Sequence, residues 1–367
     1  MSIQKISIDS FLDLATSNLV LDVRSPGEYL HAHIPGAYSL PLFTDEERKV
    51  VGTAYKQQSR KNAIKTGLEY FGVKMRKIVE EVEALIVHHQ SLAEKQLSTN
   101  NSQLTTNAIL VHCWRGGMRS AGVAWLLDLY GFKVYTLSGG YKAYRRWTRQ
   151  QFETPYPLTI LGGYTGSGKT VVLEQLEAMG HKVIDLEALA CHKGSAFGAL
   201  GEKPQPSQEM FENLLAVKLQ AVRQQTALPG VEIFIEDESQ RIGVLNIPDF
   251  FWKQMRSNPV LFLEIPFEER LGYLTEEYGK FDKAALVNAT IRIQKRLGGL
   301  ETKQAVNYLL EDNHRECFRI LLKYYDKYYE KGLAARKTDL SGIQKINCSS
   351  VEPAINIQKL LYEKITI

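Results

Sequence analysis

The stretch GGYTGSGKT, residues 162–170, restricts the possible folds of this chain more than any other part of the sequence. It fits the pattern G-x-x-x-x-G-K-[ST], with an apolar run, LTILGG, before it and a helical run, KTVVLEQLEAMG, after it. A phosphate-binding loop between a strand and a helix is typical of a parallel α/β sheet. The residues expected to bind phosphate or its Mg²⁺ ion are Gly163, Gly166, Ser167, Gly168, Lys169 and Thr170.

Such a loop binds a polyphosphate but does not specify what the phosphates are attached to. Its glycines let backbone N–H groups surround a diphosphate, Lys169 neutralises the charge, and Thr170 can bind Mg²⁺. ATP is the usual ligand, but any diphosphate ester would fit. The acidic residues Glu236, Asp237 and Glu238, at a predicted strand end, are a candidate second metal-binding element. Asp185 resembles the substrate-side acid of small P-loop kinases. Each of these acids could instead cap a helix or form a salt bridge.

The sequence predicts two α/β domains with a break near residues 148–157. In residues 1–150 we expect strands at 19–24, 108–113 and 133–140, with a polar insertion on the surface near 88–107. Thr44 and Glu47 form a capping-box pattern, and Gly131 follows an amphipathic helix. These signals predict helices that begin at 44 and end at 131.

The second predicted domain covers residues 155–367 and begins with the phosphate loop. Further strands are expected near 181–187, 232–239 and 259–265, which gives βαβ alternation and a mostly parallel sheet. Long basic helices are expected over 284–335. The polar stretch ACHKGSAFG could line the site through His192, Lys193 and Ser195, whose role stays open.

A second glycine loop, HCWRGGMRS at 112–120, contains a cysteine between a predicted strand and a predicted helix. The glycines allow several backbone N–H groups to point at one spot, and the helix N-terminus adds positive potential. We expect this nest, with Arg115 and Arg119, to lower the pKa of the Cys113 thiol and to favour a nucleophilic thiolate. The alternative is a buried structural cysteine.

Positive charge is concentrated in two stretches although the net charge is only +4. Residues 48–77 hold nine Lys/Arg and one acid, and residues 289–337 hold eleven Lys/Arg and six acids. This imbalance indicates a polyanionic partner, with solvated helix faces as the alternative. The residues that we expect to contact nucleic acid are Lys56, Arg60, Lys61, Lys65, Arg292, Lys295 and Arg296. Tyr324, Tyr325, Tyr328 and Tyr329 could stack on bases or belong to a core.

The remaining composition is typical of a cytoplasmic protein. The four cysteines are widely spaced with no CxxC pair, which argues against a zinc ribbon and for a reducing compartment. No apolar run approaches the roughly 18 residues that a membrane span requires, and the first residues lack a signal-peptide pattern. We expect no membrane association, no structural metal and no tightly bound cofactor apart from Mg²⁺.

Residues 1–150 resemble the rhodanese family of sulfurtransferases. The similarity lies in LDVRSPGEYLHAHIPGA (21–37), HCWRGGMRS (112–120) and GGYKAYRRW (139–147). It implies that Cys113 carries sulfur or selenium as a persulfide-type adduct. In ordinary rhodaneses the loop arginine follows the cysteine by five residues. Here Arg119 follows Cys113 by six, as in rhodanese-like phosphatases, so the loop could hold a tetrahedral oxyanion such as phosphate or a phosphorylated chalcogen donor.

The combination of CWRGGMRS, GSGKT, HKGSAFG and FTDEERKVVGTAYKQ resembles the bacterial tRNA 2-selenouridine synthases over the full length. That resemblance implies a transferase that acts on tRNA with 2-thiouridine at the wobble position. The sulfur is first geranylated from geranyl diphosphate, and selenium from selenophosphate then displaces the geranylthio group to give 2-selenouridine. The basic segments would hold the tRNA phosphates. Two alternatives stay open: an ATP-dependent sulfurtransferase or kinase fusion, and a phosphatase with a regulatory P-loop module.

Overall fold

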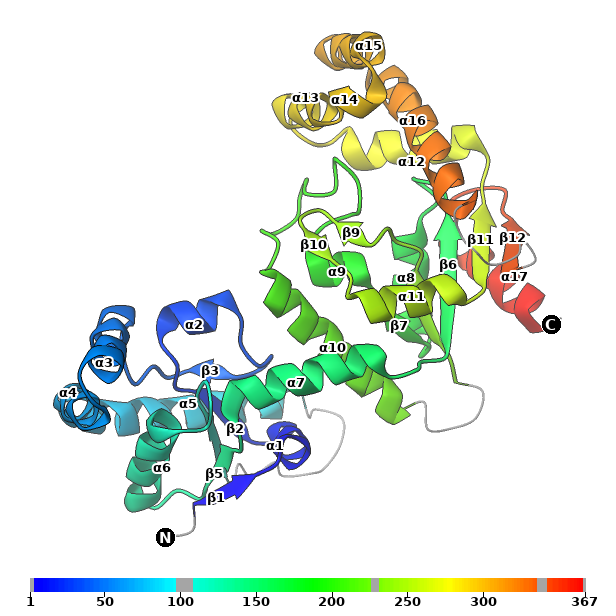
Figure 1. The fold of residues 1–367 in the computed structure, drawn as a ribbon. Helices are drawn as coiled ribbons and strands as arrows, with labels where there is room; N and C mark the ends of the chain where they lie inside the picture. Colours follow the sequence, from blue (N-terminus) through cyan, green and yellow to red (C-terminus); the bar gives the residue numbers. More distant parts are fainter. Residues whose placement is uncertain (1–2, 97–107, 226–230, 335–341, 366–367) are drawn as a thin grey trace. The chain divides into compact units, whose positions relative to one another are not determined.

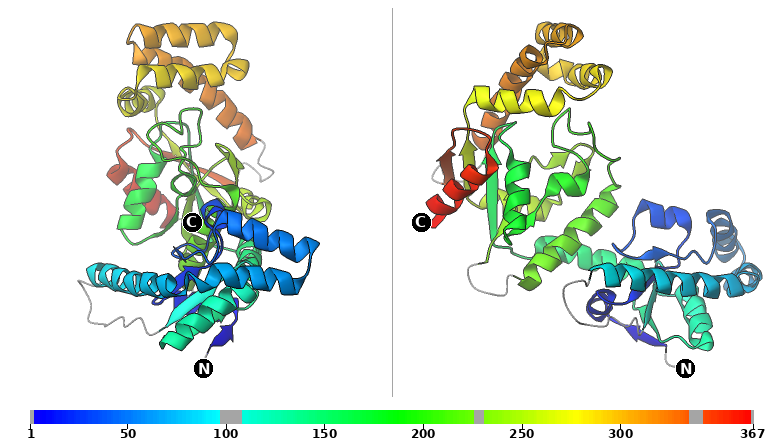
Figure 2. Two further views of the ribbon diagram at one scale, coloured as in Figure 1. Left: turned by 90° about the vertical axis from the view of Figure 1, so that its left-hand side faces the viewer. Right: turned by 180° about the vertical axis from the view of Figure 1, so that it is seen from behind.

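The computed structural model describes residues 3–96, 108–225, 231–334 and 342–365. The chain divides into two compact units, Met1–Gln150 and Gln151–Ile367, which are drawn in Figures 1 and 2. Each unit has its own parallel sheet and its own core, so the predicted α/β class is confirmed. Within the described ranges, no helix has the length and apolar character that crossing a membrane requires.

A five-stranded parallel sheet forms the centre of the first unit, in the order β1-β5-β4-β2-β3. Its strands are β1 (Gln4–Ile6), β2 (Leu19–Asp22), β3 (Tyr38–Ser39), β4 (Ile109–His112) and β5 (Val134–Leu137). All residues of β2 and β4 are buried, as expected for central strands of a parallel sheet. The three predicted strands are present but shorter, and β1 and β3 had no clear signal in the sequence.

Seven helices accompany this sheet among the described residues. They are α1 (Ile8–Ala15), α2 (Pro26–His31), α3 (Asp45–Gln57), α4 (Arg60–Gly72), α5 (Met75–Gln96), α6 (Met118–Tyr130) and α7 (Gly140–Glu153). Thr44 caps α3 in a capping box with Glu47, and Gly131 ends α6 with a φ of 110°, both as predicted. Residues 88–96 of the predicted polar insertion continue α5, and residues 97–107 lie outside the described ranges.

The second unit also contains a five-stranded parallel sheet, in the order β12-β11-β6-β8-β7. Its strands are β6 (Leu158–Gly163), β7 (Lys182–Ile184), β8 (Ile233–Glu236), β11 (Val260–Glu264) and β12 (Ile343–Asn347). β6 lies at the middle of the sheet, so the phosphate loop that follows it is placed centrally. A small antiparallel pair, β9 (Arg241–Ile242) and β10 (Leu245–Asn246), stands apart from this sheet.

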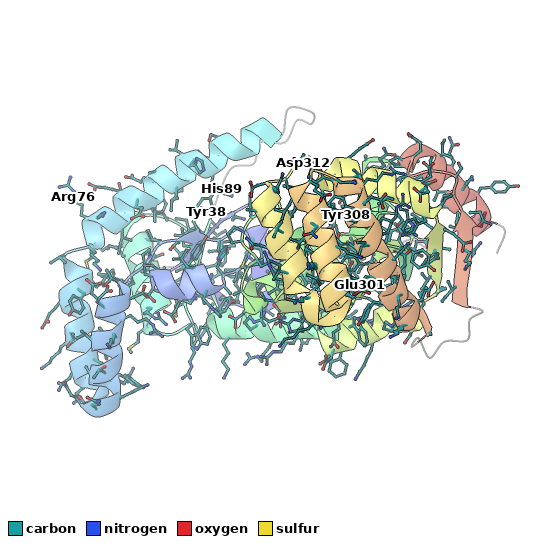
Figure 3. All side chains as sticks on the ribbon, turned by 90° about the horizontal axis from the view of Figure 1, so that it is seen from above. Tyr38, Arg76, His89, Glu301, Tyr308 and Asp312 are labelled. Atoms are coloured by element: carbon teal, nitrogen blue, oxygen red, sulfur yellow. The ribbon has the colours of Figure 1, made fainter. Side chains whose placement is uncertain are left out.

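The second unit carries two groups of helices. The first group is α8 (Lys169–Ala178), α9 (Leu186–Ala190), α10 (Gln208–Gln225), α11 (Asp249–Ser257) and α17 (Pro353–Ile365). The second group is α12 (Phe267–Tyr278), α13 (Lys283–Arg292), α14 (Gln294–Leu297), α15 (Gly299–Leu310) and α16 (His314–Ala334). The second group gathers at one end of this unit around its own apolar cluster (Figure 1). Figure 3 looks onto these helices and labels Glu301 and Tyr308 on α15.

Candidate functional site

The phosphate loop joins the end of β6 to the start of α8, as predicted. Gly166 has a φ of +80°, and a Cβ at this position would lie 2.8 Å from Leu274 Cγ and 3.1 Å from the Arg270 carbonyl oxygen. Only glycine fits there without strain. Ser167 Oγ is buried and has no hydrogen-bond partner in the described part of the protein. The loop therefore offers an unused hydroxyl beside its backbone amides.

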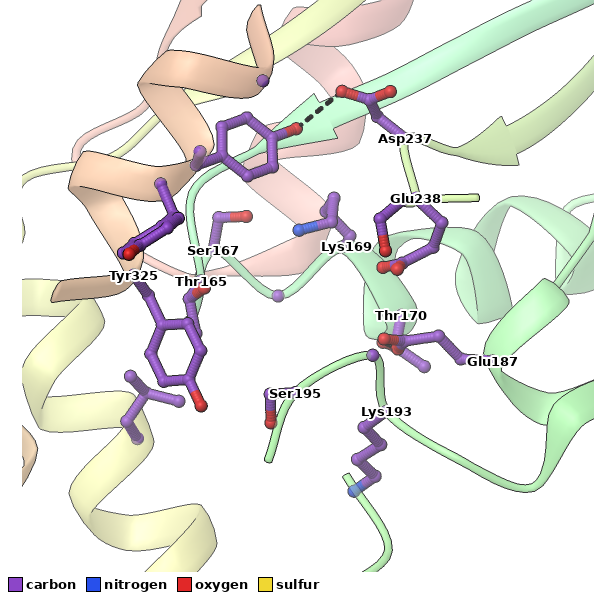
Figure 4. A pocket seen from close by; sticks show the side chains of 18 of the residues that line it. Thr165, Ser167, Lys169, Thr170, Glu187, Lys193, Ser195, Asp237, Glu238 and Tyr325 are labelled. Carbon is purple, nitrogen blue, oxygen red and sulfur yellow. Dashed lines mark hydrogen bonds between the residues drawn. The ribbon is translucent and has the colours of Figure 1, made fainter. Parts of the chain in front are cut away.

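A cavity of about 950 Å³ opens at this loop. Of the six predicted loop residues, Gly163 does not line it, and the other five do: Gly166, Ser167, Gly168, Lys169 and Thr170. Figure 4 looks into the cavity: Lys169, Thr170, Glu187 and Glu238 lie on one side, and Tyr325 and Ser195 on the other. Lys169 Nζ donates a hydrogen bond to the Gly163 carbonyl oxygen at 2.8 Å, which keeps the ammonium at the loop. The cavity thus combines one side that holds the loop lysine and two carboxyl groups with another side that is aromatic.

Two acidic residues at the cavity stand next to the loop threonine. Thr170 Oγ1 donates to Glu187 Oε2 at 3.4 Å, and the Glu187 and Glu238 carboxyls are hydrogen-bonded to each other. Burial raises the pKa of Glu187; Lys169 opposes the rise and Asp185 adds to it. Burial and the adjacent Glu187 hold the pKa of Glu238 well above its usual range. These shifts favour a proton shared between the two carboxyls.

Three of the four candidate acids, Asp185, Glu236 and Asp237, occupy different positions. Asp185 lines the cavity and also caps α9, because its Oδ1 accepts the Ala188 N–H at 2.7 Å. Asp237 lines the cavity too. Glu236 is buried and does not line it; its Oε1 accepts the Glu187 N–H at 2.9 Å. In the described ranges, no group of three or more His, Cys, Asp or Glu residues is arranged to hold a metal ion.

The pair Glu187 and Glu238 was only partly foreseen. Glu238 belongs to the acidic run after β8, which the sequence marks as a candidate metal-binding element. No motif in the sequence identifies Glu187 as a site residue, although it lies two residues beyond Asp185 in the same segment. In the stretch 190–198, Lys193 and Ser195 line the cavity, whereas His192 does not and is buried.

Helix α16 brings four tyrosines to the cavity: Tyr324, Tyr325, Tyr328 and Tyr329. The Tyr329 hydroxyl accepts the Gly163 N–H at 3.3 Å and donates to Asp237 Oδ2 at 2.9 Å. The Tyr325 hydroxyl accepts the Ala196 N–H at 3.2 Å. Tyr328 is 43% exposed. Tyr325 and Tyr329 therefore hold backbone segments in place, while Tyr328 is open to solvent.

A buried arginine connects α16 to the same loop. Arg270, on α12, is 3% exposed and makes two hydrogen bonds of 2.8 Å to the Asp326 carboxylate. Its Nη1 also donates to the Thr165 carbonyl oxygen at 3.1 Å. A fork of this kind satisfies the buried charge and fixes the geometry of its partners. The phosphate loop is thus held to α16 through both Tyr329 and Arg270.

The cysteine loop lies in the first unit between β4 and α6. Cys113 is 3% exposed, and its Sγ lies 3.2 Å from Ser120 Oγ. Burial by itself raises the pKa of the thiol, but hydrogen bonds from Ser120, together with Arg119 and the Gly117 backbone, outweigh it and leave the pKa below its usual value. The lowered pKa agrees with the sequence prediction and favours the thiolate.

The start of α7 supports this loop through backbone contacts. The Cys113 carbonyl oxygen accepts the Tyr141 N–H at 2.8 Å. Gly140 has a φ of +58°, and a Cβ there would lie 2.2 Å from that carbonyl oxygen. A side chain at position 140 would therefore push the loop out of place.

Two arginines of the loop have different environments. Arg119 Nη1 donates to Glu28 Oε2 at 2.8 Å, whereas Arg115 is exposed. Glu28 also accepts a hydrogen bond from Arg48 Nε at 3.0 Å. Burial by itself would raise the pKa of the Glu28 carboxyl, but the two arginines outweigh burial and lower it. Glu28 therefore fixes the guanidinium of Arg119 near the loop. Glu28 lies in the segment 21–37 that resembles the rhodanese family, but no pattern in the sequence indicates that it contacts Arg119, which lies 91 positions away.

The residues predicted to contact nucleic acid are all exposed: Lys56, Arg60, Lys61 and Lys65 in the first unit, and Arg292, Lys295 and Arg296 in the second. The first group belongs to the α3–α4 hairpin. The second group lies on α13 and α14, and Arg296 also lines the cavity at the phosphate loop. Exposure is necessary for phosphate contacts, so both groups remain candidates.

Comparisons with known proteins agree with this two-part structure. Residues 156–352 match the family model described as the tRNA 2-selenouridine synthase AAA domain, and residues 7–146 match the rhodanese-like domain. A tRNA 2-selenouridine synthase from Hydrogenovibrio crunogenus is 35% identical over 368 residues, which cover 91% of this chain and 95% of that protein. A protein of the same name from Bdellovibrio bacteriovorus is 32% identical over 380 residues and covers 92% and 94%, respectively.

Proposed function

The chain belongs to the tRNA 2-selenouridine synthase family, and from this premise we propose that it replaces sulfur by selenium at carbon 2 of wobble 2-thiouridine in tRNA. The observation that supports the proposal is that one chain of this family holds two distinct glycine-rich loops, each between a strand and a helix. One contains a cysteine with a lowered pKa, and the other opens into a cavity of about 950 Å³. We assign one chemical step to each loop.

The first step is geranylation at the phosphate loop. The thiouridine sulfur attacks carbon 1 of geranyl diphosphate, the carbon–oxygen bond breaks, and diphosphate leaves. Lys169 and the backbone amides around Gly166 and Gly168 stabilise the charge that grows on the leaving oxygens. Thr170 and Glu187 fit a Mg²⁺ ion that keeps several water ligands, because such ions bind through few protein oxygens plus substrate phosphates. That ion would neutralise diphosphate charge.

The second step is selenation at the cysteine loop. A thiolate is a poor leaving group from a pyrimidine carbon, and alkylation of the sulfur improves it. We assign Cys113 as the residue whose thiolate attacks the phosphorus of selenophosphate, with the loop amides and Arg119 binding the tetrahedral phosphoryl group. The phosphorus–selenium bond breaks and releases the hydrogen selenide ion, and water later hydrolyses the phosphoryl group from the thiol as phosphate. The selenium nucleophile adds to carbon 2 and geranylthiolate departs, which leaves 2-selenouridine.

The tRNA substrate accounts for the exposed basic residues of both units. Lysine and arginine side chains that neutralise phosphates bind single- and double-stranded nucleic acid independently of sequence. Lys56, Arg60, Lys61 and Lys65 on the α3–α4 hairpin supply one set, and Arg292, Lys295 and Arg296 supply the other.

Mass spectrometry of tRNA nucleosides tests the proposal. With geranyl diphosphate alone, the protein should convert 2-thiouridine to its geranylthio derivative; with selenophosphate added, it should form 2-selenouridine. Selenophosphate alone should give little product, and ATP should not be required. A reaction that needs ATP, or no product with both donors, would contradict the proposal and favour an ATP-dependent sulfurtransferase.

A further inference from the structure

A small apolar cavity lies next to the large one in the second unit. Its volume is about 30 Å³, and it shares the residues Thr165, Ser195, Leu274, Tyr278 and Tyr325 with the large cavity. Its other lining residues belong to the apolar cluster of the helical end and are at most 4% exposed: Phe197, Phe318, Leu321 and Leu322. The two cavities therefore share a wall between α12 and α16, and the small cavity forms a hydrophobic recess behind that wall.

The apolar surface begins at the phosphate loop itself. Leu274 lies so close to Gly166 that a Cβ on residue 166 would be 2.8 Å from Leu274 Cγ and 2.9 Å from Cδ1. Lys169 and Thr170 line the same large cavity as Leu274. A ligand whose phosphates rest on the loop amides would therefore have a leucine side chain directly beside it.

The polar ends of the two shared tyrosines are already bound within the protein. The Tyr325 hydroxyl accepts the Ala196 N–H at 3.2 Å. Tyr278 is hydrogen-bonded to the Ser195 side chain, and burial raises the pKa of both phenols, so they stay neutral. A wall whose hydroxyls are occupied in this way presents mainly ring faces to a ligand. It suits hydrocarbon better than a ribose, whose hydroxyls would need free hydrogen-bond partners.

We infer that the wall formed by Leu274, Tyr278 and Tyr325, with the recess behind it, binds the prenyl chain of an isoprenoid diphosphate whose diphosphate sits on the phosphate loop. The inference rests on the proposed function and specifies where its hydrocarbon lies. The recess takes the distal end of the chain and so limits chain length. Phe318, Leu321 and Leu322 at the recess are then specificity-determining residues.

Hydrogen exchange on the full-length wild-type protein tests this placement without any substitution. Geranyl diphosphate should slow amide exchange in 271–278 and 318–325 beyond the effect of inorganic diphosphate, while both ligands should protect 163–170 equally. Equal protection of the helices by both ligands would overturn the inference. If geranyl diphosphate binds no better than inorganic diphosphate and is not used as a donor, the proposed function itself fails.

Two substitutions of opposite size at Leu322 test the chain-length role. Leu322→Phe fills the recess and should raise the Kd for geranyl diphosphate about tenfold, with little effect on inorganic diphosphate, because a hydrophobic pocket discriminates by this order for a methylene-sized change. Leu322→Ala enlarges the recess and should raise the kcat/KM ratio of farnesyl over geranyl diphosphate by a similar factor.

The matched control is Leu309→Ala, which truncates a leucine of the same apolar cluster that lines neither cavity. It should lower stability comparably and leave donor selectivity unchanged. If both Leu322 variants keep the wild-type selectivity while geranylating tRNA, the prenyl chain lies elsewhere. If Leu309→Ala changes selectivity as much as Leu322→Ala, the effect comes from loosened packing and the inference is also overturned.

Discussion

Replacing Tyr329 by phenylalanine removes one hydroxyl that holds the phosphate loop to α16. In the wild-type protein this hydroxyl accepts the Gly163 N–H at 3.3 Å and donates to Asp237 Oδ2 at 2.9 Å. The pKa of Tyr329 lies well above its usual value because of burial and the nearby Asp237, so the phenol remains a donor throughout the working pH range. In the variant, Asp237 should still have Arg256 as an ion-pair partner, because Arg256 Nη1 lies 3.8 Å from Asp237 Oδ1.

The expected loss of stability follows from these contacts. A hydrogen bond to a carboxylate contributes about 1.5–3 kcal/mol, whereas the longer bond from Gly163 contributes less, so we expect about 2 kcal/mol for Tyr329→Phe. For a domain of 150–250 residues, this corresponds to a fall in Tm of about 4–8 °C. The ring itself remains, so its contacts with Tyr164 and Phe262 should persist.

Differential scanning calorimetry and titration with inorganic diphosphate measure the two consequences. The transition of the second unit should move to lower temperature, and diphosphate should bind several-fold more weakly because Gly163 is no longer held. Tyr328→Phe is the matched control on the same helix, with a ring that is 43% exposed and an expected effect below about 0.5 kcal/mol. If Tyr329→Phe behaves like this control in both measurements, the proposed link between α16 and the loop is wrong.

Three further predictions concern the first unit. Reversing Lys56, Arg60 and Lys61 to glutamate should weaken tRNA binding. The steepness of log K against log salt should fall by about 0.7–0.9 for each phosphate that the protein no longer neutralises. An unchanged slope would exclude these residues from the interface. Ser120→Ala should raise the pKa of the loop cysteine, seen as a shift of the alkylation-rate profile to higher pH, because the serine hydrogen bond helps to lower it. Burial lowers the pKa of His112 to about 4, so only the unfolded chain binds its proton between that pH and 6.5. Stability should fall as pH decreases through this window, and His112→Phe should make chemical denaturation midpoints less dependent on pH there.

The parts of the structure that depend on local sequence were predictable. The phosphate loop, the capping box at Thr44 and the stop at Gly131 follow from residue types at fixed spacing, and the structure contains all three. The strands around both loops were predictable for the same reason, since buried parallel strands are continuous apolar runs. β12 was missed because IQKIN mixes polar and apolar residues, and its partner β11 lies far away in the sequence.

The surroundings of each loop could not be predicted in the same way. Tyr329 reaches Gly163 across 166 positions, and Glu28 reaches Arg119 across 91, so no local pattern records either contact. Long-range packing also decides which acids reach the cavity: Glu187 lines it, whereas Glu236 does not. The sequence indicates that the acidic run at the end of β8 is a candidate site, but only the fold shows which of its residues line the cavity.

The most direct test of the central claim is nucleoside mass spectrometry of tRNA treated with Cys113→Ala or Lys169→Ala. Given 2-thiouridine tRNA and both donors, Cys113→Ala should accumulate geranylthiouridine without selenouridine. Lys169→Ala should geranylate on the order of 10²–10³ times more slowly, because it lacks a charge that stabilises the departing diphosphate. Supplied with pre-geranylated tRNA and selenophosphate, Lys169→Ala should still form selenouridine. If Cys113→Ala converts that tRNA at the wild-type rate, or Lys169→Ala geranylates normally but cannot selenate, the assignment of the two steps to the two loops is wrong.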